Sequence, residues 1–334
     1  MKKVSVVVPV FNGEDFISET IKSVINQSYS NWELIIVDDG STDDSERIIK
    51  EYISEKISYI KRPSTRKKGG NACRNIGIEA ATGEYIIFLD ADDLLAEYCL
   101  EQRIQWLSTH DEVDFAVFNM YRFYDDVENK KVHTILDVND PLPSFLGLNC
   151  LWQTSAPIWN RNFIKNNKFN ENYSRLQDPE LIIRCLKLKN IRFTLVKDSK
   201  PDIYYRMVTQ KNRSNLNVKR KVPSNYYNAF EQFIMDFYPI KETGIYFEKS
   251  KRSLFLLLSQ QHLFANNSSN IPRYKSLVQR LDYKMNLADK LMYKFSIYNK
   301  LLLKMRNRFL QSICARYIKY ELSRIWGNIY ISYK

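Results

Sequence analysis

Short, mainly apolar runs alternate along the first half of the chain with longer segments in which apolar residues recur every three or four positions. The runs occupy residues 4–8, 34–37, 57–60 and 85–89. A strand that is covered on both faces has such a pattern, whereas the intervening spacing is typical of amphipathic helices. The alternation up to residue 108 therefore predicts βαβ units and a mostly parallel sheet flanked by helices, which is an α/β fold.

Four features of the sequence are expected to mark the ends of these elements. Pro9 is expected to end the first strand, because proline cannot donate to a ladder of hydrogen bonds. Residues 41–44 have the form of a capping box, with Asp in place of the usual Glu or Gln. Gly83 is expected to cap the helix over 71–81. Asp93 precedes an apolar periodicity and is a candidate N-cap of the next helix.

The second half of the chain is less regular. Strands are predicted near 114–118, 131–136, 191–196 and 203–205, and a helix is predicted to begin just after Asp178-Pro179. Beyond about residue 215 the pattern becomes helical and aromatic. A chain of 334 residues is long enough for two domains. We therefore expect a catalytic domain over 1–215, with halves 1–108 and 109–215, and a helical, basic region over 216–334.

Three carboxylates follow the run at 85–89. Asp90 and Asp92 are two positions apart, so their side chains lie on one side of an extended backbone. Two converging carboxylates repel each other unless a cation or a proton lies between them, and oxygen ligands suit Mg²⁺ or Mn²⁺. The alternative is an acidic turn without a metal, in which Asp93 caps the following helix.

The first and second predicted strands also end in polar residues. The segment 9–12 follows the first strand, and Asp38-Asp39 ends the second. In a parallel sheet these ends share one edge with Asp90 and Asp92, and open α/β sheets bind ligands at that edge. Asp39 could accept a hydrogen bond from a base or a ribose, and Phe11 offers a flat apolar face. A cation at Asp92 would let a diphosphate approach the acidic edge.

Composition excludes several classes of protein. Hydrophobic residues make up 44% and charged residues 26%, which is ordinary for a globular chain. No apolar run approaches the roughly 18 residues of a membrane span. The five cysteines are widely spaced and include no CxxC pair, which fits a reducing cytosol. There is no GxGxxG or Walker A sequence, so a dinucleotide cofactor is not expected. No recognised nucleic-acid-binding module is present.

The net charge of +12 is concentrated near the end of the chain. Residues 281–334 hold 11 Lys and Arg against three acids, a net +8, which leaves +4 for the other 280 residues. Apolar residues from Leu291 to Tyr320 recur at helical spacing, with Lys300, Lys304 and Arg308 on another face. Such a stripe suits either attachment to an anionic membrane surface or packing against protein.

Three segments together resemble a known family. VSVVVPVFNGEDFISETIKSVINQSYSNWELIIVDDGSTDDS, NACRNIGIEAATGEYIIFLDADD and LQDPELIIRCL are similar to motifs of the family 2 glycosyltransferases with the GT-A fold, of the type that builds bacterial surface polysaccharides. The resemblance covers about residues 3–206. It implies an inverting transferase that needs Mn²⁺ or Mg²⁺ and moves a hexosyl or N-acetylhexosaminyl group. The donor would be a nucleotide-diphosphate sugar, with a UDP-sugar favoured, and the acceptor a glycan or a lipid-linked oligosaccharide.

The resemblance also implies roles for particular residues. Asp178 would be the general base on the acceptor hydroxyl, and Asp92 and Asp90 would hold the metal. The donor would lie against residues at the sheet edge and on segments that reach it, namely Pro9, Phe11, Asn12, Asp39, Arg74, Asp90, Asp92 and Arg206. One departure is Gln177-Asp178, where the family often has Glu-Asp.

Purely structural roles are alternatives for two of these residues, and the chain as a whole has two alternative functions. Asp178 before Pro179 also has the pattern of a helix N-cap, and Arg74 could be an exposed helix residue. A non-catalytic nucleotide-sugar-binding or scaffold protein at the membrane surface is one alternative function, and a sugar nucleotidyltransferase is another. The expected location is cytoplasmic, with peripheral attachment to the inner face of the membrane as one use of the tail.

Overall fold

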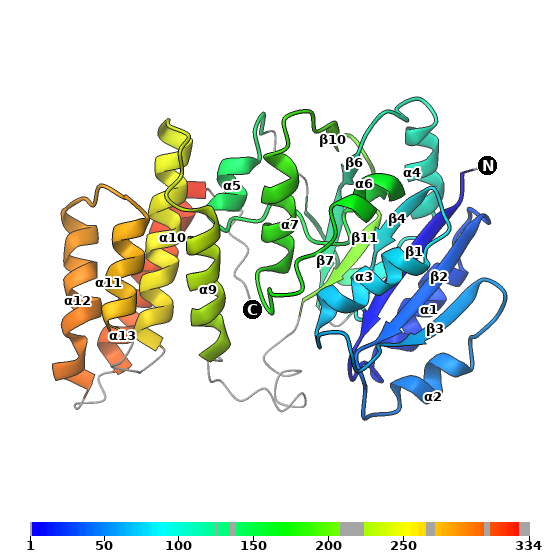
Figure 1. Cartoon of the computed structure of the whole chain (residues 1–334), viewed down its shortest axis with the longest axis horizontal. Helices are drawn as coiled ribbons and strands as arrows, with labels where there is room; N and C mark the ends of the chain where they lie inside the picture. The colour runs from blue at the N-terminus through cyan, green and yellow to red at the C-terminus, as the bar shows by residue number, and fades with distance from the viewer. Residues whose placement is uncertain are drawn as a thin grey trace. The chain divides into compact units, whose positions relative to one another are not determined.

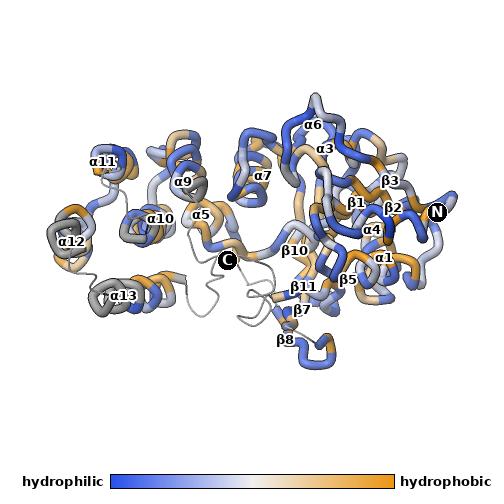
Figure 2. The backbone as a smooth tube through the Cα atoms, turned by 90° about the horizontal axis from the view of Figure 1, so that it is seen from below, coloured by the Kyte–Doolittle hydropathy of each residue, from blue (hydrophilic) through white to orange (hydrophobic). Residues whose placement is uncertain are grey.

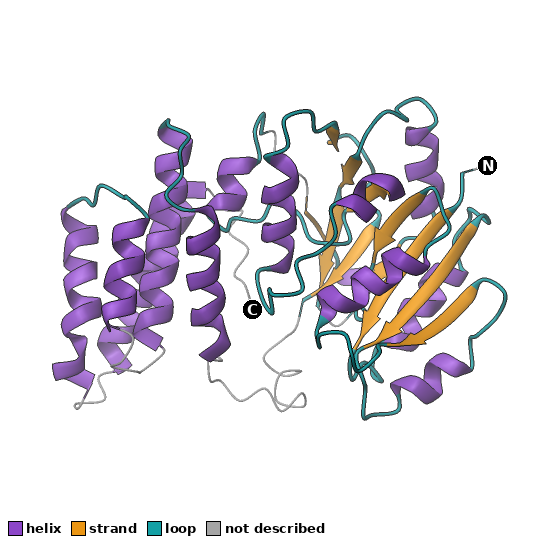
Figure 3. Cartoon of the chain, in the orientation of Figure 1, coloured by secondary structure: helices purple, strands orange, loops and turns teal. Residues whose placement is uncertain are grey.

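The computed structural model describes residues 2–124, 126–133, 138–207, 224–264, 271–303 and 308–326. The chain forms two compact units, one of residues 1–137, 152–181 and 187–219, the other of 138–151, 182–186 and 220–334. The predicted boundary at 215 lies outside the described residues. Figure 1 labels the elements of both units, and Figure 3 separates their helices from their strands.

The first unit is built on a seven-stranded sheet in the order β10-β6-β9-β4-β1-β2-β3. Its strands are β1 (Val4–Val10), β2 (Trp32–Asp38), β3 (Ile57–Lys61), β4 (Tyr85–Phe88), β6 (Phe115–Phe118), β9 (Pro157–Asn160) and β10 (Phe193–Val196). All neighbours are parallel except β9, which runs antiparallel to both β4 and β6. Since β1, β2 and β4 are almost fully buried, the prediction of strands covered on both faces is confirmed.

A smaller sheet has the order β5-β11-β7-β8. It consists of β5 (Leu94–Leu95), β7 (Met120–Phe123), β8 (Lys131–His133) and β11 (Ile203–Arg206). The helices of this unit are α1 (Ile17–Ile25), α2 (Ser45–Lys50), α3 (Gly70–Ala80), α4 (Cys99–Leu107) and α6 (Arg161–Asn166), with a 3₁₀ turn, η1 (Val127–Asn129). A further helix, α7 (Gln177–Leu186), begins in this unit, and its residues from Ile182 onward belong to the second. Figure 2 shows α3 and α6 on one side of the large sheet and α1 on the other.

The second unit is helical. It contains α5 (Leu142–Leu146), α9 (Ser224–Phe237), α10 (Ile245–Phe264), α11 (Ile271–Arg280), α12 (Leu287–Leu303) and α13 (Arg308–Trp326). The central helix is α10, which packs against each of the other five. Among the helices that the structure describes, none combines the length and the apolar composition that a bilayer crossing requires.

Several predicted boundaries are wrong. β1 continues through Pro9, which pairs with Val37 of β2; β4 pairs with β1 only as far as Val7, so one side of β1 is open at Pro9 and needs no donor there. Ser41 does not cap α2, because its hydroxyl donates to Asp38 instead. Asp93 does not cap a helix, since Leu94–Leu95 forms β5 and α4 begins only at Cys99.

The predicted apolar stripe in the tail is exposed at both of its ends. The stripe falls on two helices, α12 and α13, separated by residues 304–307, which lie outside the described residues. Leu291 is 61% exposed and Tyr320 is 62% exposed, whereas Met292, Ile318 and Leu322 are buried. At its two ends, therefore, the stripe does not pack within the helical unit, and these residues remain available for attachment to a membrane surface.

Two glycines allow close packing around the sheet. A Cβ on Gly77 of α3 would overlap the side chain of Val7 on β1. A Cβ on Gly83 would lie 2.7 Å from the carbonyl oxygen of Lys3. Gly83 is therefore required by the approach of two backbones, and its predicted role as a helix cap is wrong, since α3 ends in Ala81 with extended backbone.

Replacing Gly77 with alanine should lower the stability of the first unit by about 1–3 kcal/mol or more, because the added methyl group overpacks the α3–β1 contact. Thermal unfolding followed by circular dichroism measures the effect. The double variant Val7→Ala/Gly77→Ala should lose less stability than the sum of the two single variants, because removing the Val7 methyl groups makes space. Additive losses would contradict this account of the contact.

Candidate active site

The carboxyl ends of β1, β2 and β4 meet at one cavity of about 370 Å³ within the first unit. β1 lies between β2 and β4 in the sheet, with Val10 of β1 in register with Asp38 of β2. The structure brings together residues that are up to 197 positions apart in sequence. Eight predicted donor-binding residues line this cavity, namely Pro9, Phe11, Asn12, Asp39, Arg74, Asp90, Asp92 and Arg206.

The two aspartates that end β2 have different surroundings. Asp38 is fully buried; its Oδ1 accepts from Ser41 Oγ at 2.6 Å and its Oδ2 accepts from the Tyr59 hydroxyl at 2.8 Å. Asp39 lines the cavity, and its Oδ1 accepts from Arg62 Nε at 2.5 Å and from the Gly69 amide at 3.0 Å. Asp38 therefore holds the turn, and Asp39 presents a fixed carboxylate at the cavity wall.

The loop after β1 forms the neighbouring wall. The Asn12 amide donates to Ser41 Oγ at 2.9 Å, and Asn12 Oδ1 accepts from the Thr42 amide at 2.9 Å. These bonds tie the ends of β1 and β2 together. Phe11 is 47% exposed, and Lys68 Nζ lies 4.2 Å from the centre of its ring. A flat aromatic face and a cation thus lie beside Asp39.

The turn after β4 concentrates negative charge. Asp90 and Asp92 are half-buried and line the cavity, whereas Asp93 is buried beneath them. Burial raises the pKa of Asp93 well above its ordinary value, and the charges of Asp92 and Asp90 raise it further. Negative charge at this turn is therefore stabilised by a nearby cation or by a proton.

Arg206 of β11 fixes this turn from the other sheet of the unit. Its amide donates to Asp93 Oδ1 at 2.9 Å, and its Nε donates to the carbonyl oxygen of Asp92 at 2.8 Å. The Arg206 side chain is 10% exposed, its guanidinium lies over the rings of Phe16 and Phe123, and it pairs with Glu19. Arg206 therefore fixes the backbone of the turn that carries the Asp92 side chain.

Arg74 is buried, so the exposed alternative for this residue is wrong. Its Nη2 donates to Asp90 Oδ1 at 2.6 Å, and its Nη1 donates to Gln177 Oε1 at 3.0 Å. Burial acts to lower the pKa of Arg74, but the Asp90 and Asp178 carboxylates outweigh it and raise the pKa. Arg74 is therefore a permanent positive charge between the acidic turn and the start of α7.

One face of α3 anchors the loop that leads to α7. Asn75 exchanges two hydrogen bonds with the backbone of Phe169, at 2.9 and 3.0 Å, and its Nδ2 also donates to Glu171.

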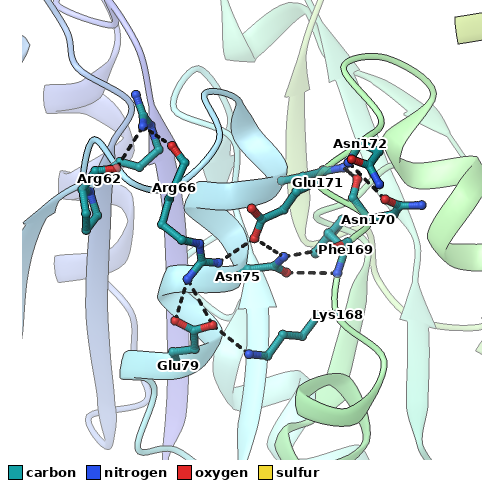
Figure 4. A network of polar contacts seen from close by, with 11 residues as sticks. Arg62, Arg66, Asn75, Glu79, Lys168, Phe169, Asn170, Glu171 and Asn172 are labelled. Carbon is teal, nitrogen blue, oxygen red and sulfur yellow. Dashed lines mark hydrogen bonds and ion pairs between the residues drawn. The ribbon is translucent and has the colours of Figure 1, made fainter.

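Arg66 bridges Glu79 on α3 and Glu171 on the loop, as Figure 4 shows. Asn71, one turn earlier than Asn75, donates to the carbonyl oxygen of Asn170. This network holds the loop against α3, and the loop carries Gln177 and Asp178 to Arg74.

Asp178 is half-buried in the first turn of α7. The helix begins one residue earlier, and the Glu180 amide donates to the carbonyl oxygen of Leu176. Asp178 is therefore inside the helix, and the N-cap alternative is wrong. Burial raises its pKa, Arg74 lowers it, Asp90 raises it and a hydrogen bond with Thr154 lowers it; the net shift is upward. A carboxylate with a raised pKa is a better proton acceptor than an ordinary aspartate.

The sequence of this unit decides which family the chain belongs to. Residues 5–199 match the family model described as "Glycosyl transferase family 2". The chain belongs to glycosyl transferase family 2. It is 34% identical over 215 residues to "Amylovoran biosynthesis glycosyltransferase AmsB" of Erwinia amylovora, covering 62% of this chain and 70% of AmsB. It is 31% identical over 234 residues to "Minor teichoic acid biosynthesis protein GgaB" of Bacillus subtilis, covering 67% of this chain and 25% of GgaB.

A third relative is "Putative teichuronic acid biosynthesis glycosyltransferase TuaG" of Bacillus subtilis, 40% identical over 108 residues that cover 31% of this chain and 41% of TuaG. The match therefore spans most of AmsB but less than half of GgaB or TuaG. AmsB and TuaG are named as glycosyltransferases, and with the family model they confirm the predicted class of enzyme.

Solved structures confirm the fold. The crystal structure of "S. aureus TarS 1-349 in complex with UDP-GlcNAc" matches with a TM-score of 0.55 and 18% identity, covering 98% of this chain and 90% of that chain. The predicted GT-A fold is thus confirmed for this family 2 chain.

The carboxylates of the family 2 chain suit a divalent cation only if other ligands complete its shell. Among the described residues, no group of three or more His, Cys, Asp or Glu side chains is arranged to hold a metal alone. Mg²⁺ in nucleotide sites is bound through one or two carboxylates, waters and the phosphates themselves. Asp90 and Asp92 fit that kind of site, because they offer two carboxylates and their negative charges already raise the pKa of the neighbouring Asp93.

Three residues of this site were not predicted. Arg62 fixes Asp39, and Gln177 accepts from Arg74 inside the cavity, where the Glu common in family 2 would add another charge. Burial raises the pKa of Tyr205, and four carboxylates (Asp93, Asp90, Asp92 and Asp178) raise it further. Two of them carried a sequence signal: Gln177 is the departure from the Glu-Asp pattern of the family, and Tyr205 directly precedes Arg206.

Proposed function

We propose that the chain is an inverting glycosyltransferase that moves a sugar from a nucleotide-diphosphate sugar to a hydroxyl group of a glycan or a lipid-linked oligosaccharide. The observation that supports this most directly is Asp178, a carboxylate of raised pKa that is close enough to Arg74 and Asp90, two residues of the cavity wall, for their charges to shift its pKa. The names of the relatives support a glycan acceptor.

In the proposed complex the nucleoside lies between Phe11 and Asp39, and the diphosphate lies over Asp90 and Asp92. Asp39 accepts a hydrogen bond from the base or the ribose, with Arg62 and the Gly69 amide fixing its carboxylate. Asp90 and Asp92 would hold Mn²⁺ or Mg²⁺, which supplies Lewis-acid stabilisation of charge on the departing diphosphate. Arg206 keeps the Asp92 backbone in place during this binding.

The proposed reaction is a single displacement. The acceptor oxygen forms a bond to the anomeric carbon as the bond from that carbon to the diphosphate oxygen breaks. Asp178 takes the proton from the acceptor hydroxyl, and the electron pair of the broken bond leaves with the nucleoside diphosphate. One displacement from the opposite side inverts the anomeric centre and needs no nucleophile on the protein.

A screen of donors tests this proposal. UDP-, GDP- and dTDP-sugars are compared for binding and for slow hydrolysis in the presence of Mn²⁺. We expect a UDP-hexose or UDP-N-acetylhexosamine to be preferred, since TarS, which shares the fold, was crystallised with UDP-GlcNAc. If no nucleotide sugar binds with or without Mn²⁺, the proposal fails.

We also propose that residues 281–334 attach the enzyme to the surface of an anionic membrane. The segment carries a net +8, and Leu291 and Tyr320 are exposed on its helices. The side chains of Lys300, Lys304 and Arg308, the predicted basic face, lie outside the described residues.

A further inference from the structure

The helical unit contains a second cavity, of about 360 Å³, which shares no lining residue with the candidate active site. It is lined by side chains from three segments that are distant in sequence. These are the first two turns of α10, the connection between α11 and α12, and the last turn of α13. Figure 1 shows that these three segments lie at the same end of the helical unit.

The lining is strongly basic. Lys249 and Arg252 come from α10, Lys284 from the α11–α12 connection and Arg324 from α13. The one acidic lining residue, Glu248, is paired with Lys251 at 2.8 Å. A cavity lined in this way suits an anion, and a phosphate group in particular, because it offers several oxygens to donors that converge from different sides.

Buried carboxylates hold the central cation of this cavity in place. Arg252 donates to Asp289 at 3.2 and 3.3 Å and pairs with Glu321 at 2.8 Å. Asp289 is fully buried and also accepts from the Tyr283 hydroxyl at 2.5 Å. The four cations of the lining exceed these two buried carboxylates by two positive charges. The guanidinium is thus pre-organised, and the surplus charge matches a doubly charged phosphate or a diphosphate.

Exposed apolar side chains surround the same end of the unit. Ile245 lines the cavity and is 70% exposed, and its neighbour Tyr246 is 62% exposed. Leu287, at the start of α12, is 75% exposed. Single exposed apolar residues are ordinary, but apolar residues beside a basic cavity match the boundary between lipid headgroups and acyl chains.

We propose that this cavity binds the phosphate group of an anionic lipid, with Ile245, Tyr246 and Leu287 entering the interface around it. The inference rests on the membrane attachment proposed above and gives it a location and a ligand. A soluble phosphate or diphosphate would satisfy the same cations but would make no use of the exposed apolar side chains.

Co-sedimentation with vesicles tests the cavity with the full chain. The variant Lys249→Gln/Lys284→Gln removes two cations of the lining that are outside the Arg252 network. The matched control, Lys290→Gln/Lys294→Gln, removes two exposed charges from α12 that do not line the cavity. Arg252 is left intact, because its loss would strand two buried carboxylates.

We expect the wild type to bind vesicles that contain phosphatidylglycerol and to be released as salt rises. The cavity variant should bind about 25-fold more weakly, from about fivefold for each cation lost near an anionic surface. The control should change by less than about threefold. Equal losses in both variants would mean that only the overall charge matters, and no loss in the cavity variant would overturn the site.

Two further measurements are needed. One distinguishes a lipid phosphate from a soluble phosphate as the ligand, and the other distinguishes a failure of lipid binding from a failure of the proposed transferase activity. The variant Ile245→Ser/Leu287→Ser should lose vesicle binding but keep any affinity for inorganic pyrophosphate. If the wild type binds pyrophosphate but does not bind vesicles, the lipid assignment is overturned. Nucleotide-sugar binding without vesicles should be the same in wild type and cavity variant. Failure of the wild type in that assay would count against the proposed transferase and leave the lipid result standing.

Discussion

Replacing Asp178 with asparagine should reduce sugar transfer by about 10²-fold or more, the scale of general-base catalysis, while leaving affinity for the nucleotide diphosphate unchanged. The carboxylate is close enough to Arg74 and Asp90 for their charges to affect its pKa, but it does not line the donor cavity. Initial rates of transfer and calorimetric titration of the nucleoside diphosphate measure the two quantities separately.

Stability provides the first control for this variant. Asparagine has nearly the same shape and can still accept from Thr154, and burial disfavours the charged carboxylate that it replaces. The melting temperature should therefore change little. Asp198→Asn removes an exposed carboxylate from the same unit and should leave both rate and affinity unchanged. Transfer by Asp178→Asn at the wild-type rate would exclude Asp178 as the base.

The same residue should set the acid limb of the pH profile. A general base acts only when deprotonated, so transfer falls as the pH falls through its pKa. Because burial raises the pKa of Asp178, this loss should begin at a higher pH than for an ordinary aspartate. The asparagine variant should lack that limb, which can be checked by comparing kcat against pH for the two proteins.

The central strands could be predicted because their residues are apolar at successive positions, as a strand needs when both faces of the sheet are buried. The apolar runs before Pro9, Asp38 and Asp90 fit only buried strands, and parallel strands bring their carboxyl ends to one edge. That argument was enough to place residues 9–12, Asp39, Asp90 and Asp92 around one cavity. It used no information about contacts between distant segments.

The parts that were missed depend on such contacts. β9 is a four-residue strand, Pro157–Asn160, whose place between β4 and β6 is set by the two neighbours and not by any periodicity of its own. Arg62 reaches Asp39, and Gln177 reaches Arg74, only after the loops around α3 have folded. Asp93 has the spacing of a helix cap, but burial beneath Arg206 gives it another role.

In the helical unit, the sequence left open which apolar residues are buried. The helices α12 and α13 carry apolar residues on several faces, so their periodicity does not determine which face is buried. Packing against α10 selects Met292 and Ile318, and leaves Leu291 and Tyr320 exposed. Net charge was more informative, because it depends on composition alone and directed attention to the segment that contains Lys284 and Arg324.

Replacing Asp92 with asparagine should weaken Mn²⁺-dependent binding of the nucleoside diphosphate by about 10²-fold. Even indirect partners of metal ligands contribute 10- to 100-fold to metal affinity, so a direct ligand should contribute at least as much. The fold should survive, because the side chain is half-buried at the cavity and the substitution keeps the carbonyl oxygen that accepts from Arg206. Calorimetric titration with and without Mn²⁺ measures the effect.

A matched variant separates metal binding from general electrostatics. Asp15→Asn removes an exposed carboxylate from the β1–α1 loop, between the lining residues Gly13 and Phe16, and should leave the Mn²⁺-dependent affinity unchanged. The loss of affinity for the nucleoside diphosphate in Asp92→Asn should be smaller without Mn²⁺ than with it. Without the metal, the wild-type carboxylate only repels the diphosphate, so its removal costs no binding. If Asp92→Asn binds the nucleotide as tightly as wild type in Mn²⁺, the cation must be held elsewhere, and Asp90 with its Arg74 partner becomes the residue to vary next.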